Sequence, residues 1–131
     1  MEKILEHFKN DTFANLLGMK IQKVEVGYAE VTMNITENML NFHSTANGGA
    51  IFSLADAAFA YASNSHGQTA VGITMTMHYV QASAVGDQLT ATATEDTRSK
   101  RLGLYRIEVT NQTGKLVALA EGLVYRKEKR F

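Results

Sequence analysis

A single carboxylate interrupts the most apolar stretch of the sequence. From Ala50 to Ala62 (AIFSLADAAFAYA), Asp56 is the only ionisable side chain apart from the Tyr61 phenol. A carboxylate is costly to bury unless it is paired or used. Either Asp56 is a structural carboxylate that hydroxyls or a basic residue satisfy, or it acts in a site as a nucleophile or a base.

Two consecutive glycines stand at the start of the same stretch. Asn47 is a good helix N-cap residue, and Gly48 and Gly49 follow it at the first helical positions. Because glycine is a poor helix former, the pair needs a reason. The glycines would let a ligand approach the unpaired first-turn N–H groups, which could polarise a carbonyl or hold an oxyanion. Alternatively, they would only let the loop turn or let a strand pack closely.

The spacing of Gly48 and Asp56 limits how the two can cooperate. Eight residues of helix span about 12 Å. A hydrogen-bond donor and an attacking group must each lie about 3 Å from the same carbonyl. A helix that begins at Gly48 cannot offer both to one carbonyl, so a shared site would need two subunits with antiparallel helices side by side. The spacing thus links a catalytic interpretation to a dimer.

The rest of the sequence predicts the elements that would position these residues. The glycines open one long helix that ends near Gly67 and is apolar on every face, which predicts burial on all sides. An amphipathic helical opening is predicted before Gly18. Strands are predicted at Lys20–Val26, Ala29–Thr36, Ala70–Val80, Asp87–Asp96, Leu102–Asn111 and Lys115–Lys127. This order predicts an α+β fold, an antiparallel sheet of five to six strands wrapped around one central helix, in a single domain of residues 1–131.

Composition excludes several classes of protein. The formal net charge is zero, from 13 basic and 13 acidic residues, which argues against a nucleic-acid partner. There is no Cys, which excludes disulfides, thiolate zinc sites and cysteine nucleophiles. The four His lack metal-site spacing, so neither a metal nor another cofactor is predicted. No segment has the roughly 18 apolar residues of a membrane span, and the charged opening is unlike a secretory signal, so a cytoplasmic location is expected.

The stretch from Met39 to Gly67 resembles a known family. MLNFHSTANGGAIFSLADAAFAYASNSHG is similar to the signature of hotdog-fold acyl-CoA thioesterases of the phenylacetic-acid-degradation type. That signature has an Asn, a His six residues later, then Gly-Gly, and an Asp nine residues after the His. The corresponding positions here are Asn41, Asn47, Gly48, Gly49 and Asp56. The likeness extends over most of the chain, roughly Gly18 to Arg126.

The resemblance implies a homo-oligomer that hydrolyses an acyl-CoA thioester, with sites at the subunit interface. Family dimers share a continuous sheet, and two dimers often form a tetramer; coenzyme A is part of the substrate and not a cofactor. The Gly48 N–H would polarise the thioester carbonyl, and Asp56 of the facing subunit would be the nucleophile or the general base. Asn41 would help to position the carbonyl or the attacking water. Thr74 would assist that water, since Thr74 and Thr76 share a strand face that could lie near the helix.

Other residues are candidates for substrate contacts. Arg98, Lys100 and Arg101 lie between two strands and would form either a basic mouth for the phosphates of coenzyme A or a solvated turn. Asn47 and Gly49 would contact the substrate at the helix start. The acyl pocket would be set by Phe52, Phe59, Met75 and Tyr79.

Asn47 departs from the family pattern, which places His there. Asn can cap a helix, but it cannot transfer protons near pH 7. If the family His is structural, the chain is an ordinary thioesterase; otherwise it is a slow enzyme or a non-catalytic acyl-CoA-binding module. His43 would then partly replace the missing His or be an ordinary loop residue, and His66 is expected at the surface. A hydratase of the same fold fits less well, because its chemistry needs a His at the helix start.

Overall fold

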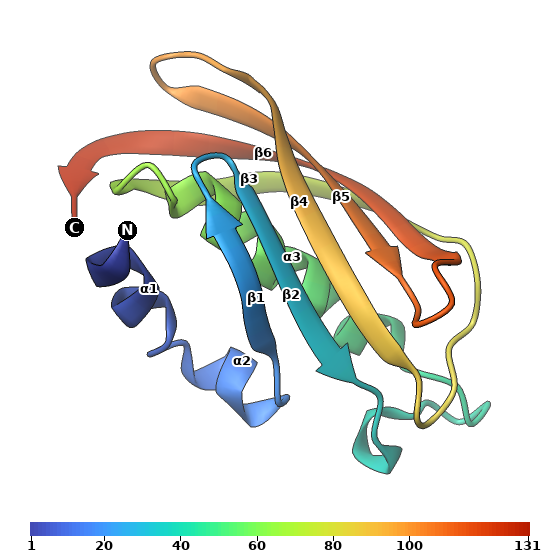
Figure 1. Cartoon of the computed structure of the whole chain (residues 1–131). Coiled ribbons are helices and arrows are strands. Elements are labelled where there is room, and N and C mark those ends of the chain that lie inside the picture. Colours follow the sequence, from blue (N-terminus) through green and yellow to red (C-terminus); the bar gives the residue numbers. More distant parts are fainter.

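Six antiparallel strands form one sheet that curves around the long helix α3 (Figure 1). The structure is a computed structural model that describes all 131 residues. Its elements are α1 (Glu2–Phe8), α2 (Thr12–Leu16), β1 (Lys20–Glu25), β2 (Tyr28–Asn34), the 3-10 helix η1 (Glu37–Met39), α3 (Gly48–Asn64), β3 (Gln68–Tyr79), β4 (Gln88–Arg98), β5 (Leu102–Thr110) and β6 (Leu116–Arg130). No helix combines the length and the apolar character needed to cross a bilayer.

The strand order is β1-β2-β4-β5-β6-β3, and every neighbouring pair is antiparallel. The predicted α+β architecture is therefore confirmed, with six strands. The strand that follows α3 crosses to pair with β6, so β3 forms one edge of the sheet and β1 forms the other (Figure 1). Tight turns join the hairpins where the sequence predicts them: Gly27 between β1 and β2 and Gly114 between β5 and β6 both have positive φ, a conformation that glycine adopts without strain.

Small side chains on the concave face of the sheet let α3 pack closely against it. Along β4, Ala91 and Ala93 are fully buried while the intervening threonines are partly exposed, as the period of two along a strand requires. On the helix, Leu54, Ala55, Ala58 and Ala62 are completely buried. This packing fixes the rotation of α3, and so decides which of its residues remain at the surface.

One face of α3 stays open, which corrects the expectation that the helix is buried on all sides. Gly49 and Asp56 are exposed, and Phe52, Ser53 and Ala60 are only partly buried. The physical reason is that β3 ends the sheet, so no further strand of the chain continues it past this face of α3. Helix α3 therefore has more apolar surface than a single copy of the chain buries.

The N-terminal region forms two short helices and not the single helical opening that the sequence predicts. Asp11 ends the first segment, because its Oδ1 accepts a hydrogen bond from the Ala14 N–H at 3.1 Å and caps α2. A side-chain cap of this kind favours the start of a new helix over continuation of the old one.

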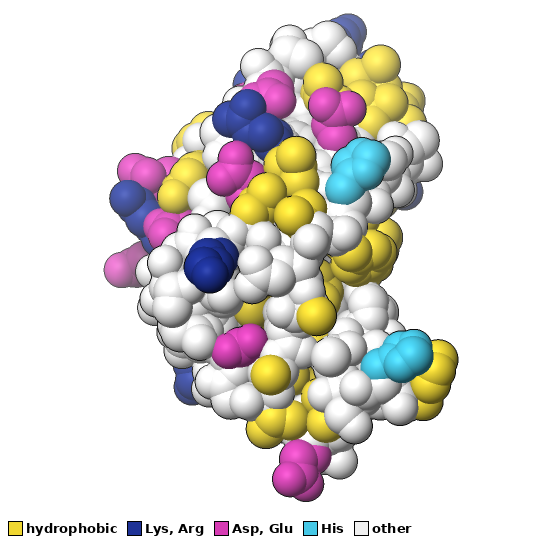
Figure 2. Space-filling view, turned by 90° about the vertical axis from the view of Figure 1, so that its right-hand side faces the viewer, with side chains coloured by type: hydrophobic (Ala, Val, Ile, Leu, Met, Phe, Trp, Pro, Cys, Tyr) yellow, Lys and Arg dark blue, Asp and Glu magenta, His cyan; other side chains and the backbone are white.

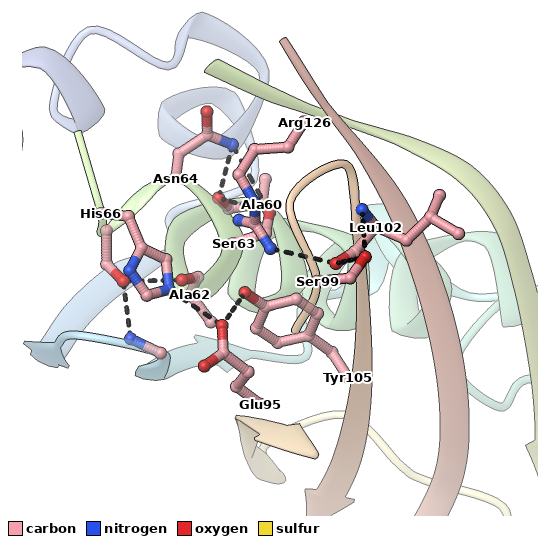
Figure 3. Close-up of polar contacts among 12 residues, drawn as sticks. Ala60, Ala62, Ser63, Asn64, His66, Glu95, Ser99, Leu102, Tyr105 and Arg126 are labelled. Carbon is pink, nitrogen blue, oxygen red and sulfur yellow. Dashed lines mark hydrogen bonds and ion pairs between the residues drawn. The ribbon is translucent and has the colours of Figure 1, made fainter. Parts of the chain in front are cut away.

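His66 is not at the surface, which is a second correction. Its side chain is 10% exposed, and its Nε2 lies 2.8 Å from Glu95 Oε1, which also accepts a hydrogen bond from the Tyr105 hydroxyl at 2.6 Å (Figure 3). Burial raises the pKa of Glu95, but the hydrogen bonds from Tyr105 and His66 outweigh burial and lower the pKa below its ordinary value. Glu95 is 29 residues from His66, so no local sequence pattern around His66 predicts this contact.

Candidate active site

The start of α3 presents a backbone N–H that has no partner within the chain. Asn47 has extended φ/ψ, and its Oδ1 accepts a hydrogen bond from the Gly49 N–H at 2.7 Å, which confirms the predicted N-cap. The N–H of Gly48 makes no hydrogen bond in the structure. Gly48 borders a hollow of about 250 Å³ with Ile51, Tyr79 and neighbouring residues. A carbonyl that entered this hollow would find a free donor at the positive end of the helix dipole.

Both glycines lie at close approaches at the helix start. A Cβ on Gly48 would lie 3.3 Å from Cζ of Tyr79, whose hydroxyl donates to the Gly48 carbonyl at 3.1 Å. A Cβ on Gly49 would lie 3.0 Å from Oδ1 of Asn47, the atom that caps the helix. The pair of glycines thus serves local packing and also leaves the backbone accessible.

Asp56 borders a different hollow, of about 250 Å³, between the open face of α3 and the edge strand β3. Phe52, Phe59, Thr74 and Met75 border the same hollow, so five of the sequence candidates come together here. The Asp56 carboxylate makes no hydrogen bond and no ion pair within the chain, and its side chain is exposed to solvent. Partial burial raises its pKa, and the charge of Asp11 raises it further. The carboxylate is therefore unpaired and more basic than an ordinary aspartate.

Phe59 forms the buried wall of this hollow and is part of the core. Its side chain is 2% exposed, and its ring lies against the two glycines Gly72 and Gly122 of strands β3 and β6. It meets Tyr105 edge to face at 5.8 Å between ring centroids. The role that the sequence assigns to Phe59, contact with substrate, is thus limited to the part of the ring that borders the hollow.

The two threonines of β3 have different surroundings. The register pairs Met75 with Gly122 on the inner face and Thr76 with Glu121 on the outer face. A shift of register between Gly72 and Thr74 brings Thr74 to the border of the Asp56 hollow. Thr76 instead lines a separate hollow with Glu121, so the expectation that it could lie near the helix is wrong.

Asn41 organises the loop before α3. Its Oδ1 accepts hydrogen bonds from the His43 N–H at 2.8 Å and from the Thr45 N–H at 3.2 Å. The Asn41 Nδ2 has no partner in the chain and could donate to a ligand. Within one chain Asn41 does not border the Asp56 hollow. His43 is exposed, and its ring lies at a tilt to that of Phe42 with ring centroids 4.0 Å apart.

The basic candidates lie on the turn between β4 and β5. Arg101 is held by Glu128, with NH2 to Oε1 at 2.7 Å, while Arg98 and Lys100 are exposed and unpaired. Figure 1 places this turn at the end of the sheet opposite to the start of α3. In a single chain the basic turn is therefore not brought to Gly48.

The face of the molecule in Figure 2 carries no large patch of one charge, and no metal cluster accompanies these residues. Viewed from the right-hand side of Figure 1, apolar side chains form several separate groups with acidic and basic side chains between them (Figure 2). No group of three or more His, Cys, Asp or Glu side chains is arranged to hold a metal ion.

One pair of interacting residues was not identified from the sequence. The Tyr61 hydroxyl donates to Asp11 Oδ2 at 2.7 Å, and both residues border a hollow of about 530 Å³. The helix-capping position of Asp11 could have been recognised, but its contact 50 residues away in sequence could not.

The sheet wraps around one helix, which has a free N–H at its start and an unpaired carboxylate eight residues later. These features define a hotdog-fold protein suited to carbonyl chemistry. The chain belongs to the thioesterase superfamily, whose family model matches residues 43–118. This confirms the family and the fold that the resemblance implies.

Individual relatives cover nearly the whole chain. The acyl-coenzyme A thioesterase PaaI of Escherichia coli K12 is 45% identical over 119 residues, which are 91% of this chain and 85% of the relative. The solved structure of E. coli PaaI has a TM-score of 0.93 at 43% identity and covers 95% of this chain and 91% of that one. A Streptococcus mutans UA159 protein solved with bound acetyl CoA has a TM-score of 0.83 at 27% identity, with 86% and 91% covered.

Proposed function

We propose that the chain is an acyl-CoA thioesterase that hydrolyses a thioester to free coenzyme A and a carboxylic acid. The observation that carries this proposal is the unpaired Asp56 carboxylate, which borders a hollow together with Thr74. Asp56 lies on α3, whose first N–H, at Gly48, is free. Similarity to the E. coli acyl-coenzyme A thioesterase supports the substrate class. The S. mutans relative with acetyl CoA supports a coenzyme A ligand.

In this mechanism the Gly48 N–H donates to the thioester carbonyl oxygen and stabilises the negative charge that develops on it. The ionised Asp56 either attacks the carbonyl carbon or takes a proton from a water that attacks it. The carbon–sulfur bond then breaks and coenzyme A leaves as the thiolate. After direct attack, water hydrolyses the mixed anhydride left on Asp56, which releases the carboxylic acid and restores the carboxylate. Thr74 would orient the water through its hydroxyl, and the free Nδ2 of Asn41 would orient the carbonyl. Asn47 and Gly49 would contact substrate at the helix start.

The proposed site combines two copies of the chain, with Gly48 from one and Asp56 from the other. The two residues border separate hollows of one chain, and eight residues of helix separate them by about 12 Å. The edge strand β3 supports a homodimer, because its 12 residues contain no Lys, Arg, Asp, Glu or Pro. Natural edge strands are commonly protected by such residues, and an unprotected edge is a template for pairing. The proposal extends to a tetramer of two such dimers.

The basic turn is proposed to contact the phosphates of coenzyme A. Arg98 and Lys100 support this role because they are exposed and unpaired, whereas Arg101 already pairs with Glu128. The whole chain would act as one domain in the cytoplasm, with no cofactor besides the substrate. Light scattering tests the oligomer, and charge reversal of Arg98 and Lys100 tests the phosphate contact through KM.

The decisive experiment assays thiol release from a panel of acyl-CoA thioesters with wild type, Asp56→Asn and Asp56→Ala. Both substitutions should abolish turnover while circular dichroism and coenzyme A binding stay unchanged. Turnover that survives both would refute the role of Asp56. A single turnover in ¹⁸O-water tests direct attack. If water cleaves the mixed anhydride at the Asp56 carbon, the first product molecule carries an enzyme-derived oxygen, which the general-base route cannot give.

Asn47 favours a second candidate function, a hotdog module that binds acyl-CoA without hydrolysing it. The side chain of Asn47 is engaged as the helix cap and cannot act as a base near pH 7. Tight binding of acyl-CoA by the wild type with no thiol release would establish this alternative. Recovery of turnover in Asn47→His would then identify the missing imidazole as the cause.

A further inference from the structure

A backbone donor and a side-chain donor lie together in the hollow at the start of α3. The first is the free N–H of Gly48, and the second is the hydroxyl of Tyr79, the last residue of β3. The register pairs Tyr79 with the buried Ala118 of β6 and has no shift from Met75 onward, so the Tyr79 side chain faces α3. The lining of the hollow has no charged side chain, and its one other polar side chain is Gln81.

The two donors are close enough to bind a single oxygen atom. The Tyr79 hydroxyl oxygen would lie 3.5 Å from a Cβ placed on Gly48. Standard bond lengths put that Cβ about 2.5 Å from the Gly48 nitrogen, so the two donor atoms are at most about 6 Å apart. An oxyanion accepts each hydrogen bond at about 3 Å, and one oxygen between the two donors can therefore accept from both.

The Tyr79 hydroxyl can exchange its present acceptor for such an oxygen. It donates to the Gly48 carbonyl at 3.1 Å, which is longer than the 2.5–3.0 Å that is usual for an O–H donor. The hydroxyl proton rotates to suit its acceptor. The Gly48 carbonyl lies in the first turn of α3 and keeps the helical hydrogen bond from the N–H four residues later. A charged oxygen is the better acceptor, because charge-assisted hydrogen bonds are roughly twice as strong as neutral ones.

We propose that Tyr79 is a catalytic residue whose hydroxyl donates a second hydrogen bond to the oxyanion, beside the Gly48 N–H of the same copy. The inference rests on the proposed function, because it assigns a further residue to the site that hydrolyses the thioester. When the carbonyl carbon is attacked, its oxygen gains negative charge and accepts from both donors. The phenol keeps its proton throughout, and the electron pair returns from the oxygen to re-form the C=O bond as the carbon–sulfur bond breaks. This role differs from the contact with the acyl group that the sequence assigns to Tyr79.

Tyr79→Phe tests this role, because it removes one oxygen atom and keeps the ring that packs on Gly48. A donor that binds the charged oxygen more strongly than the ground-state carbonyl stabilises the transition state, so kcat should fall while KM changes little. We expect kcat to fall roughly 10- to 100-fold, because the Gly48 N–H remains as the first donor. Tyr125→Phe is the matched control, since Tyr125 is 41% exposed, lies on β6 and does not border the hollow. An equal fall in kcat in both variants would overturn the assignment.

Infrared spectroscopy detects the hydrogen bonds to the substrate carbonyl directly and needs no turnover. The probe is acetyl-CoA labelled with ¹³C at the carbonyl carbon, bound to the oligomer of Asp56→Asn so that the thioester stays intact. Each donor weakens the C=O bond, so the carbonyl band should lie at lower frequency than in free acetyl-CoA. When Tyr79→Phe is added to Asp56→Asn, the band should move back toward the free value. Gln81→Met in the same background removes the other polar side chain of the hollow and should leave the band in place.

The outcomes separate this inference from the proposed function. A carbonyl band that keeps its frequency when Tyr79→Phe is introduced overturns the inference, whatever the activity of the protein. A band that moves in Gln81→Met and not in Tyr79→Phe also overturns it, because the second donor would then be Gln81. A band that moves as expected with Tyr79→Phe, in a protein whose wild type releases no thiol from any acyl-CoA of the panel, supports the Tyr79 hydrogen bond and refutes the proposed function alone.

Discussion

Gly122→Ala should destabilise the protein through the Phe59 ring, which borders the Asp56 hollow. A Cβ at Gly122 would lie 2.7 Å from both Cε1 and Cζ of Phe59, whereas ordinary contact begins at 3.4 Å. The difference of about 0.7 Å must be taken up by the ring, which Tyr105 meets edge to face. Overpacking of this kind costs about 1–3 kcal/mol. For a chain of this length we expect a fall in Tm of roughly 3 °C for each kcal/mol.

A double-mutant cycle isolates this contact from any effect on strand formation. Phe59→Ala alone should cost about 3–5 kcal/mol because it leaves a cavity. In that background Gly122→Ala no longer meets a ring, and it should be neutral or stabilise by up to about 1 kcal/mol by restricting the unfolded chain. The coupling energy between the two substitutions is therefore expected to exceed about 1 kcal/mol.

Urea unfolding followed by far-UV circular dichroism and tyrosine fluorescence measures these energies, since the chain has no Trp. Protein concentration must be held constant, because dissociation of an oligomer would shift the midpoint. If Gly122→Ala costs the same free energy with and without the Phe59 ring, the clash is not the cause. The assignment of Phe59 as a rigid wall resting on glycine would then be wrong.

Substitutions at three further positions test the capping residue, the free N–H and the buried acid. Asn47→Ala should lower the free energy of unfolding by about 1 kcal/mol because Gly49 loses its cap, and Asn47→Ser should retain most of it; equal losses in urea unfolding would contradict this. Gly48→Ala should keep or raise the free energy of unfolding, since the exposed Tyr79 ring can move aside. It should lower kcat/KM, because the added methyl group obstructs the Gly48 N–H. An unchanged kcat/KM would exclude a catalytic role for this N–H. Hydrogen bonds lower the pKa of Glu95, against the opposing effect of burial, from its ordinary 4.5. The stability that ionised Glu95 contributes is full above that pH and is lost as the pH falls through the lower pKa of Glu95 in the folded state. Glu95→Gln should therefore flatten the dependence of the urea midpoint on pH between pH 6 and pH 3.

The strands and the long helix were predictable because their signals are local. The Thr-Ala alternation of β4 specifies which side chains face α3, and Asn47 followed by two glycines marks the start of the helix to the residue. Turn glycines marked the hairpins. The break between α1 and α2 was missed, because the apolar spacing of the N-terminal region continues across Asp11 and the side-chain cap at that residue interrupts it.

The site was predictable as a set of residues but not as an arrangement. Asp56 and Gly48 were identified from residue type and spacing, and the structure places them at separate hollows as the spacing requires. The burial of His66 against Glu95 and the contact of Asp11 with Tyr61 depend on segments 29 and 50 residues apart. Only the folded sheet and helix bring such segments together, so no periodicity in one segment encodes them.

The disagreement between the apolar pattern of α3 and its observed exposure carries information of its own. A helix that is apolar on every face requires neighbours on every face, yet one copy of the chain leaves a stripe through Phe52 and Asp56 open beside the edge strand β3. That stripe and the uncharged edge lie next to each other, so one partner could cover both. A second copy would do so while placing its own Gly48 N–H near Asp56, and this arrangement would explain in a single step why the helix is apolar all round, why the edge lacks protective charges, and why one carboxylate is kept among apolar side chains.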